Sequence, residues 1–176
     1  MTTQTQRTKR VAILVENEFE DIAFKVPNTA LKQAGAIITV LGARMNDDYK
    51  GHHGTVTVTP DATTTEVHAE DFDAFVILGG SIRVNPNVIR LVREAIALKK
   101  WVVAIGIGPQ VLIEADQLSG KQITGFRAIR KDIEICRRDL HRYADSGRYA
   151  LNHCPQARRF ADCDDHIVQA IGDLNP

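Results

Sequence analysis

The chain has 176 residues, a length that suits one domain with a substantial core, and 44% of its residues are apolar. Lys and Arg together number 22, as do Asp and Glu, so the formal net charge is +0 and nothing favours binding to nucleic acid or to a membrane surface. There is no apolar run of the length of a signal peptide or a membrane span, and an odd set of three unpaired cysteines fits a reducing compartment, so we expect a cytoplasmic protein.

Short apolar runs alternate with amphipathic stretches along the chain, and Gly or Pro separates many of them. This alternation predicts an α/β fold with a mostly parallel sheet and helices on both faces. We expect one domain over residues 9–172, preceded by a polar, flexible tail at 1–8. Strands are expected at 11–15, 36–41, 73–78, 101–105, 121–124 and 149–152, with a hairpin around 51–59; helices are expected at 22–34, 85–100, from 109 onward, 128–140 and 155–171.

The spacing of apolar residues also predicts which faces of the first two helices point inward. Gly35 is expected to end the first helix as a C-terminal cap. The predicted inward residues are Ala23, Val26, Ala30 and Ala34 in the first helix, and Ile89, Val92 and Ile96 in the second.

The segment 101–109, WVVAIGIGP, predicts a buried strand, a tight turn and a helix that starts at Pro109. Open α/β sheets place their functional sites at such turns, at the carboxyl ends of the strands. In hydrolases with this arrangement the exposed turn residue is Ser or Cys. Here it is Gly106.

Four motifs, in chain order, resemble those of the ThiJ/PfpI superfamily. Phe19-Glu20-Asp21 is followed by Pro27 and Leu31 at the family spacing. The turn GHHG at 51–54 resembles the family sequence GKHG, and DFDAFVILGG at 71–80 resembles FDALVIPGG. AIGIGP at 104–109 lies where the family has AICHGP. The resemblance implies a flavodoxin-like three-layer sandwich, similar to class I glutamine amidotransferases, and a homodimer or hexamer.

The chain departs from the family pattern at its most reactive position. The resemblance puts Gly106 where relatives such as PfpI-type proteases and deglycases carry a nucleophilic cysteine, and Ile107 where many carry histidine. Phe126 lies where some relatives have Tyr. Two interpretations are open: the domain has given up cysteine chemistry, or the turn is a βα loop that needs glycine. Both deny a nucleophile at position 106.

Glu20 is the candidate catalytic residue. In the family the equivalent glutamate lies beside the cysteine and shares a proton with it, so without a thiol Glu20 could act as a general base on bound water. The alternative is an acidic residue in the first turn of a helix, where the helix dipole favours negative charge.

The candidate ligand-binding residues are Gly79, Gly80, Gly106, Ile107 and His153. Backbone N–H groups of Gly79, Gly80 and Ile107 could bind an oxyanion, which would suit a small carbonyl or carboxylate ligand, although the glycines could also serve only a sharp turn. Cys154 and Cys163 do not have a familiar zinc spacing, so we expect no metal and no cofactor. His52 and His53 are expected to be solvated loop residues.

These observations predict a ThiJ/PfpI-like domain without cysteine-dependent catalysis, which binds a small ligand or a partner as an oligomer. The first alternative is a cysteine-independent hydratase or hydrolase with Glu20 as general base. The second is a structural or interaction module that once accompanied another domain.

Overall fold

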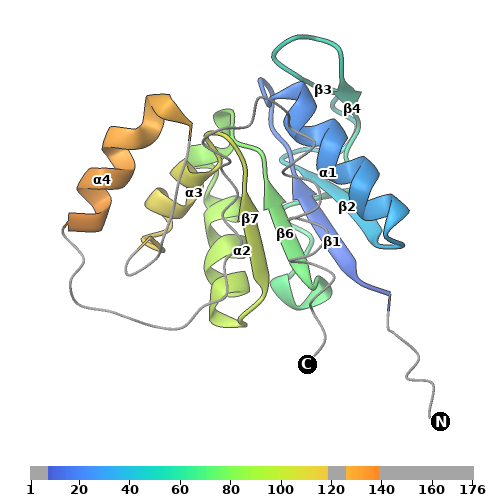
Figure 1. Cartoon of the computed structure of the whole chain (residues 1–176). Coiled ribbons are helices and arrows are strands. Elements are labelled where there is room, and N and C mark those ends of the chain that lie inside the picture. The colour runs from blue at the N-terminus through green and yellow to red at the C-terminus, as the bar shows by residue number, and fades with distance from the viewer. Residues whose placement is uncertain (1–7, 119–125, 139–176) are drawn as a thin grey trace.

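The computed structural model describes residues 8–118 and 126–138. They form a parallel sheet with helices on both sides and a small antiparallel hairpin above one edge (Figure 1). The predicted flavodoxin-like α/β architecture is therefore confirmed. The expectations for the N-terminal tail up to residue 7, for the strands at 121–124 and 149–152, for the helix at 155–171 and for His153, Cys154 and Cys163 lie outside the described residues.

The central strand of the sheet is β1, which spans Arg10–Leu14 and is buried on both faces after its first residue. The strand order is β5-β2-β1-β6-β7, and all pairs are parallel. Leu14 pairs with Leu41 on one side and with Ile77 on the other, so neighbouring strands end at the same level. The other strands are β2 (Ile37–Gly42), β5 (Ala62–Thr63), β6 (Ala74–Ile77) and β7 (Trp101–Ala104); the hairpin pairs β3 (Tyr49–Lys50) with β4 (Thr57–Val58).

Local sequence signals explain where the helices begin and end. The side chain of Asn85 accepts hydrogen bonds from the N–H groups of Asn87 and Val88, and Pro86 occupies the first helical position of α2. Gly35 follows the first helix with φ +82, as its predicted capping role requires. The helices are α1 (Asp21–Gln33), α2 (Pro86–Ala97), α3 (Pro109–Glu114) and α4 (Arg130–Arg138), with short 3₁₀ turns η1 (Ala69–Asp71), η2 (Ser81–Val84) and η3 (Arg127–Ile129).

The predicted inward faces of α1 and α2 are partly wrong. Ala34 is exposed, and Val26 and Ala30 are only half-buried. The reason is that the larger side chains of Phe24 and Leu31 occupy the core, which rotates the buried stripe of α1. In α2, Ile89 and Ile96 are half-buried, whereas the fully buried residues are Val88, Leu91, Val92 and Ala95. Helix α2 also ends three residues before Lys100, because Lys99 adopts φ +56.

Two cores form on the opposite faces of the sheet. Ala12 and Leu14 point toward the core shared with α2, α3 and α4, whereas Val11 and Ile13 point toward the core shared with α1. No helix within residues 8–118 and 126–138 is long and apolar enough to cross a membrane.

The strand order creates one special edge of the sheet. From β1 the chain crosses to β2 on one side, and from β6 it crosses to β7 on the other, so the switch point lies between the carboxyl ends of β1 and β6. Sheets of this type bind ligands in the crevice at that point. The loops that leave β1, β6 and β7 therefore define where a site is expected.

Candidate functional site

Three loops converge on Gly79 and Gly80, which follow β6. Both glycines have positive φ angles, +85 and +88. A Cβ atom on Gly79 would lie 2.5 Å from Cγ1 of Ile107, and one on Gly80 would lie 3.0 Å from the carbonyl oxygen of Asn17. The positive φ and the close contacts both require glycine at these two positions. Because they carry no side chain, the segment after β6 can pack between the β1–α1 loop and the turn after β7.

The turn after β7 is built from two glycines with different physical roles. Gly106 has φ +61, and apart from its chain neighbours no atom of the described residues lies within 4 Å of where a Cβ would stand. Gly108 has an ordinary helical φ of −50, but a Cβ there would collide with the carbonyl oxygen of Ile77. The carbonyl of Gly106 accepts a hydrogen bond from the N–H of Phe126 at 3.0 Å. The space beside Gly106 is open, while Gly108 is fixed by close packing.

Two backbone donors at this edge have no acceptor within the described part of the chain. None of the described residues accepts a hydrogen bond from the N–H of Gly80 or of Ile107, whereas the N–H of Gly108 bonds to the carbonyl of Ile105 at 2.8 Å. Unpaired N–H groups beside a strand end are suited to bind an oxyanion or a carboxylate. The structure thus brings together four of the predicted ligand-binding residues, Gly79, Gly80, Gly106 and Ile107.

Glu20 lies at the end of the β1–α1 loop, at the N-cap position of α1. Its side chain makes no capping hydrogen bond to the helix and is 39% exposed. Its Oε2 atom lies 3.7 Å from Nε2 of His53, which comes from the turn between β3 and β4. The side chain is therefore available to a ligand, and it faces an imidazole rather than the helix N–H groups.

Glu18, on the same loop, pairs with the other histidine of the turn. Its Oε2 atom lies 3.0 Å from Nδ1 of His52, and its backbone adopts φ +66. This hydrogen bond and the negative charge of Glu18 raise the pKa of His52 above its ordinary 6.5. Because the folded pKa is the higher one, any stabilisation by this pair is fully present below pH 6.5 and is lost as the pH rises through the folded pKa. The histidines predicted to be solvated are exposed, but each faces a carboxylate.

Asp21 is a site residue that the sequence interpretation missed. Its carboxylate is buried and accepts hydrogen bonds from the N–H groups of His53, Thr55 and Val56 and from the hydroxyl of Thr55, at 2.7–2.9 Å. Burial opposes its charge, but these hydrogen bonds outweigh it and lower the pKa to about 2. Its stabilising effect is therefore present above pH 3.8 and is lost as the pH falls toward 2. Two sequence features could have indicated this contact: an acidic residue at the start of the first helix, and the Gly-rich turn GHHG at 51–54.

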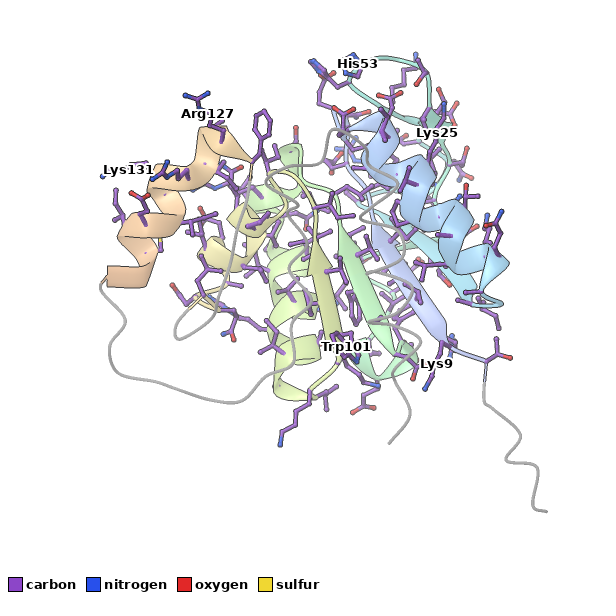
Figure 2. The ribbon with its side chains drawn as sticks, viewed as in Figure 1. Lys9, Lys25, His53, Trp101, Arg127 and Lys131 are labelled. Carbon is purple, nitrogen blue, oxygen red and sulfur yellow. The ribbon has the colours of Figure 1, made fainter. Side chains whose placement is uncertain are left out.

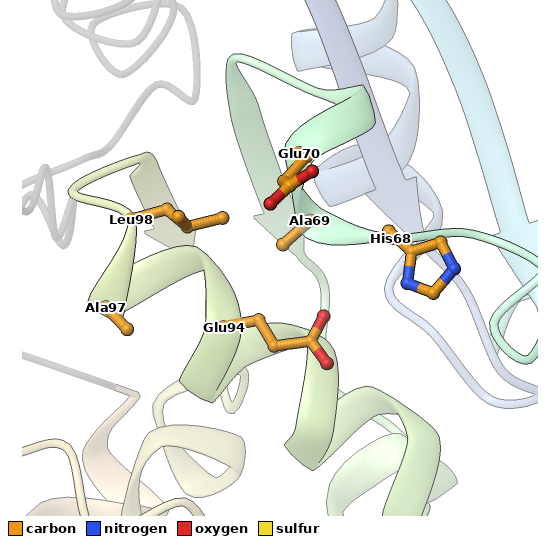
Figure 3. Close-up of a pocket in the computed structure, with 6 residues that line it drawn as sticks. All are labelled: His68, Ala69, Glu70, Glu94, Ala97 and Leu98. Atoms are coloured by element: carbon orange, nitrogen blue, oxygen red, sulfur yellow. The ribbon is translucent and has the colours of Figure 1, made fainter.

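The hollow in Figure 3 lies at the other end of the sheet. It has a volume of about 520 Å³ and lies between η1 and the C-terminal end of α2, both of which precede the amino ends of strands. Glu94, on its wall, is already held by Arg90 at 2.9 Å. The residues that line it are His68, Ala69, Glu70, Glu94, Ala97 and Leu98. The described part of the chain also contains no group of three His, Cys, Asp or Glu residues placed to hold a metal.

Fold and site together define a class: an open parallel α/β domain with a candidate anion site at its topological switch point and glycine at its strand–turn–helix elbow. The family model described as DJ-1/PfpI family matches residues 9–150. The chain belongs to that family.

Two curated relatives from Bacillus subtilis cover about three quarters of the chain. General stress protein 18 is 36% identical over 136 residues, which are 75% of this chain and 79% of that protein. The protein named "Putative cysteine protease YraA" is 38% identical over 133 residues, 72% of this chain and 76% of that one.

Solved structures share this fold, and one of them carries a second domain. A two-domain protein from Anabaena variabilis, which contains DJ-1/ThiJ/PfpI-like and ferritin-like domains, is 46% identical with a TM-score of 0.76; the match covers 82% of this chain and 43% of that one. This chain thus spans less than half of the two-domain protein. Drosophila melanogaster DJ-1beta, 22% identical over 95% of each chain with a TM-score of 0.74, shares the fold.

The two glycines of the turn are expected to respond differently to alanine. Gly106→Ala meets open space and should cost about 1 kcal/mol, the penalty of a side chain at positive φ. Gly108→Ala pushes a methyl group into the backbone of β6 and should cost about 3 kcal/mol. Urea unfolding of both variants measures the free energies of unfolding, and an equal or reversed order would contradict the geometry.

Proposed function

We propose that this domain acts without cysteine chemistry and binds a small carbonyl or carboxylate ligand at its switch-point crevice, as a cytoplasmic oligomer. The observation that carries the proposal is the turn itself: Gly106 leaves open space among the described residues, and the N–H groups of Gly80 and Ile107, on adjoining loops, have no acceptor among those residues. Such donors suit an oxygen-bearing ligand, and without a side-chain nucleophile at position 106 the turn itself forms no covalent bond to it.

The described cysteine does not offer a replacement nucleophile. Cys136 lies on α4, is half-buried and packs against the core that α2 and α3 share. A thiol in such surroundings behaves as a small apolar side chain. Glycine at position 106 also removes the strain that a cysteine would carry at φ +61, so the turn has neither the reactive group nor its conformational cost.

Ligand binding is tested by titrating ¹⁵N-labelled protein with acetate and, as a neutral carbonyl, acetone. Saturable shifts of the Gly80 and Ile107 amide signals are expected in the millimolar range, because few contacts hold so small a ligand. The amides of Gly35 and Lys100, which follow the C-terminal ends of α1 and α2 and lie away from this edge of the sheet, serve as internal controls. Shifts that are absent, or that spread equally to the control amides, would refute the ligand site.

A second candidate is a cysteine-independent hydratase or hydrolase. It is favoured by Glu20, whose side chain is partly exposed and is not used as a helix cap. The purified protein is screened against peptides, methylglyoxal, glycated amines and isocyanides. If turnover is found, Glu20→Gln should lower it at least about 100-fold, as expected for loss of a general base, whereas Glu70→Gln at the other end of the sheet should not. Turnover that survives both Glu20→Gln and replacement of all three cysteines by alanine would exclude both candidates.

A third candidate is an interaction domain, and the Anabaena variabilis relative favours it. In that protein a domain 46% identical to this chain is joined to a ferritin-like domain, so we propose a ferritin-like partner for this chain as well. Size-exclusion chromatography with light scattering should give the mass of two or of six chains for the protein alone, and the mass of one chain would contradict the oligomer. Added ferritin-like domain of the relative, produced separately, should shift that peak; an elution profile equal to the sum of the two separate runs would contradict the partner.

A further inference from the structure

We propose that Asp21 is a positioning residue of the candidate site, which holds the turn at residues 51–54 so that His53 stays beside Glu20. The proposal assigns the turn to the site and rests on the function proposed above. It concerns a residue that does not itself face the ligand.

Both oxygens of the Asp21 carboxylate accept hydrogen bonds from the turn and from the residues that follow it. Oδ1 accepts hydrogen bonds from the N–H of Thr55, the hydroxyl of Thr55 and the N–H of Val56, each at 2.7 Å, and Oδ2 accepts one from the N–H of His53 at 2.9 Å. All of these groups are donors. Only a side chain that accepts at both ends satisfies them, because an amide would place its own N–H against a backbone N–H.

An acid at the start of a helix can instead act through the helix dipole. The hydrogen bonds of Asp21 argue against that as its main role, because its oxygens are bonded to the turn, 32 to 35 residues away in sequence, and not to the first turn of α1.

The base and the tip of the turn are held by different contacts. The base is joined to the β1–α1 loop by backbone hydrogen bonds, from Glu18 N–H to the carbonyl of Lys50 at 3.0 Å and from His52 N–H to the carbonyl of Phe19 at 2.8 Å. The segment from His53 to Val56, which includes the tip, is joined to α1 by Asp21. It is joined to the base by hydrogen bonds from the N–H of Gly51 to the carbonyl of Val56 at 3.0 Å and from the N–H of Gly54 to the carbonyl of Gly51 at 2.9 Å, so Asp21 is its link to α1. Loss of the carboxylate should therefore release the tip while the base stays docked.

The lack of a side chain at Gly51 supports this arrangement. A Cβ at Gly51 would lie within 2.7 Å of the Asp21 carboxylate oxygens, so only glycine lets the carboxylate approach this closely. Gly54 reverses the chain with φ +66. The two glycines of the GHHG motif thus serve the Asp21 contact and the turn that follows it.

The result of this packing is a pair of imidazole–carboxylate contacts between the turn and the β1–α1 loop. His53 faces Glu20 at 3.7 Å and His52 faces Glu18 at 3.0 Å, while the two rings contact each other edge to face at 5.1 Å. Figure 2 shows His53 on the turn, at the end of the molecule where α1 begins. Because both imidazoles are exposed, the backbone of the turn, rather than burial, keeps them in place.

The experiment compares Asp21→Asn with a matched variant, Asp48→Asn. Asp48 directly precedes β3, is exposed and accepts a hydrogen bond from the hydroxyl of Thr59. In Asp21→Asn the amide hydrogens of His53, Thr55 and Val56 should exchange at least about tenfold faster, because their buried acceptor is replaced by a poorer one. The nuclear Overhauser contact between the His53 ring and the Glu20 side chain should disappear, while methyl signals of the two cores stay in place. Asp48→Asn should change neither the exchange nor the contact.

Retained protection and a retained His53–Glu20 contact in a folded Asp21→Asn variant would overturn the proposal. If that variant does not fold, Thr55→Val removes a single donor to the same carboxylate, and it should speed exchange of the Thr55 and Val56 amides by about threefold; unchanged exchange would overturn the proposal equally. Acetate titration of wild type and Asp21→Asn distinguishes failure of the ligand site from failure of the positioning role of Asp21. Absence of acetate binding in wild type refutes the ligand site, while the exchange and contact measurements still decide the role of Asp21.

Discussion

The constraint on which the rest of this structure depends is the parallel pairing of β1 with a strand on each side. Leu14 pairs with Leu41 and with Ile77, so the chain leaves the sheet at one level on three neighbouring strands. Since the crossovers run in opposite directions from β1 and β6, no helix can cover the gap between their carboxyl ends. The strand order therefore sets where a ligand crevice is expected, and the loops that leave the three strands set its shape.

Close backbone approach shapes that crevice. Gly79, Gly80 and Gly108 each occupy a place where a methyl group would meet a neighbouring loop or strand. Gly106 differs, because it has open space and only its positive φ disfavours a side chain. Packing therefore restricts three of these positions, and conformation restricts the fourth. Glycine at position 106 therefore meets the backbone requirement of the turn, and apart from its chain neighbours no described residue occupies the space where a side chain would begin.

The pairs Glu18–His52 and Glu20–His53 join the β1–α1 loop to the turn at residues 51–54. Glu18 and Glu20 are partly or largely exposed and each pairs with an exposed imidazole, contacts that are individually weak in water. Asp21 is different: its charge is buried and its hydrogen bonds are short, so it is the acid whose removal should be felt. One buried carboxylate can thus order two exposed pairs through the backbone that carries them.

By itself the sequence determined the fold class, the strands β1, β2, β6 and β7, and the glycine at the elbow, because buried parallel strands and βα turns have strong local signatures. It did not determine the rotation of α1, since packing of Phe24 and Leu31 overrides a stripe of small residues. Nor did it predict the role of Asp21, because the donors that surround its carboxylate come from residues 53–56, more than thirty positions away. Only the tertiary structure brings that turn to the helix, and with it the histidines that had looked like ordinary loop residues.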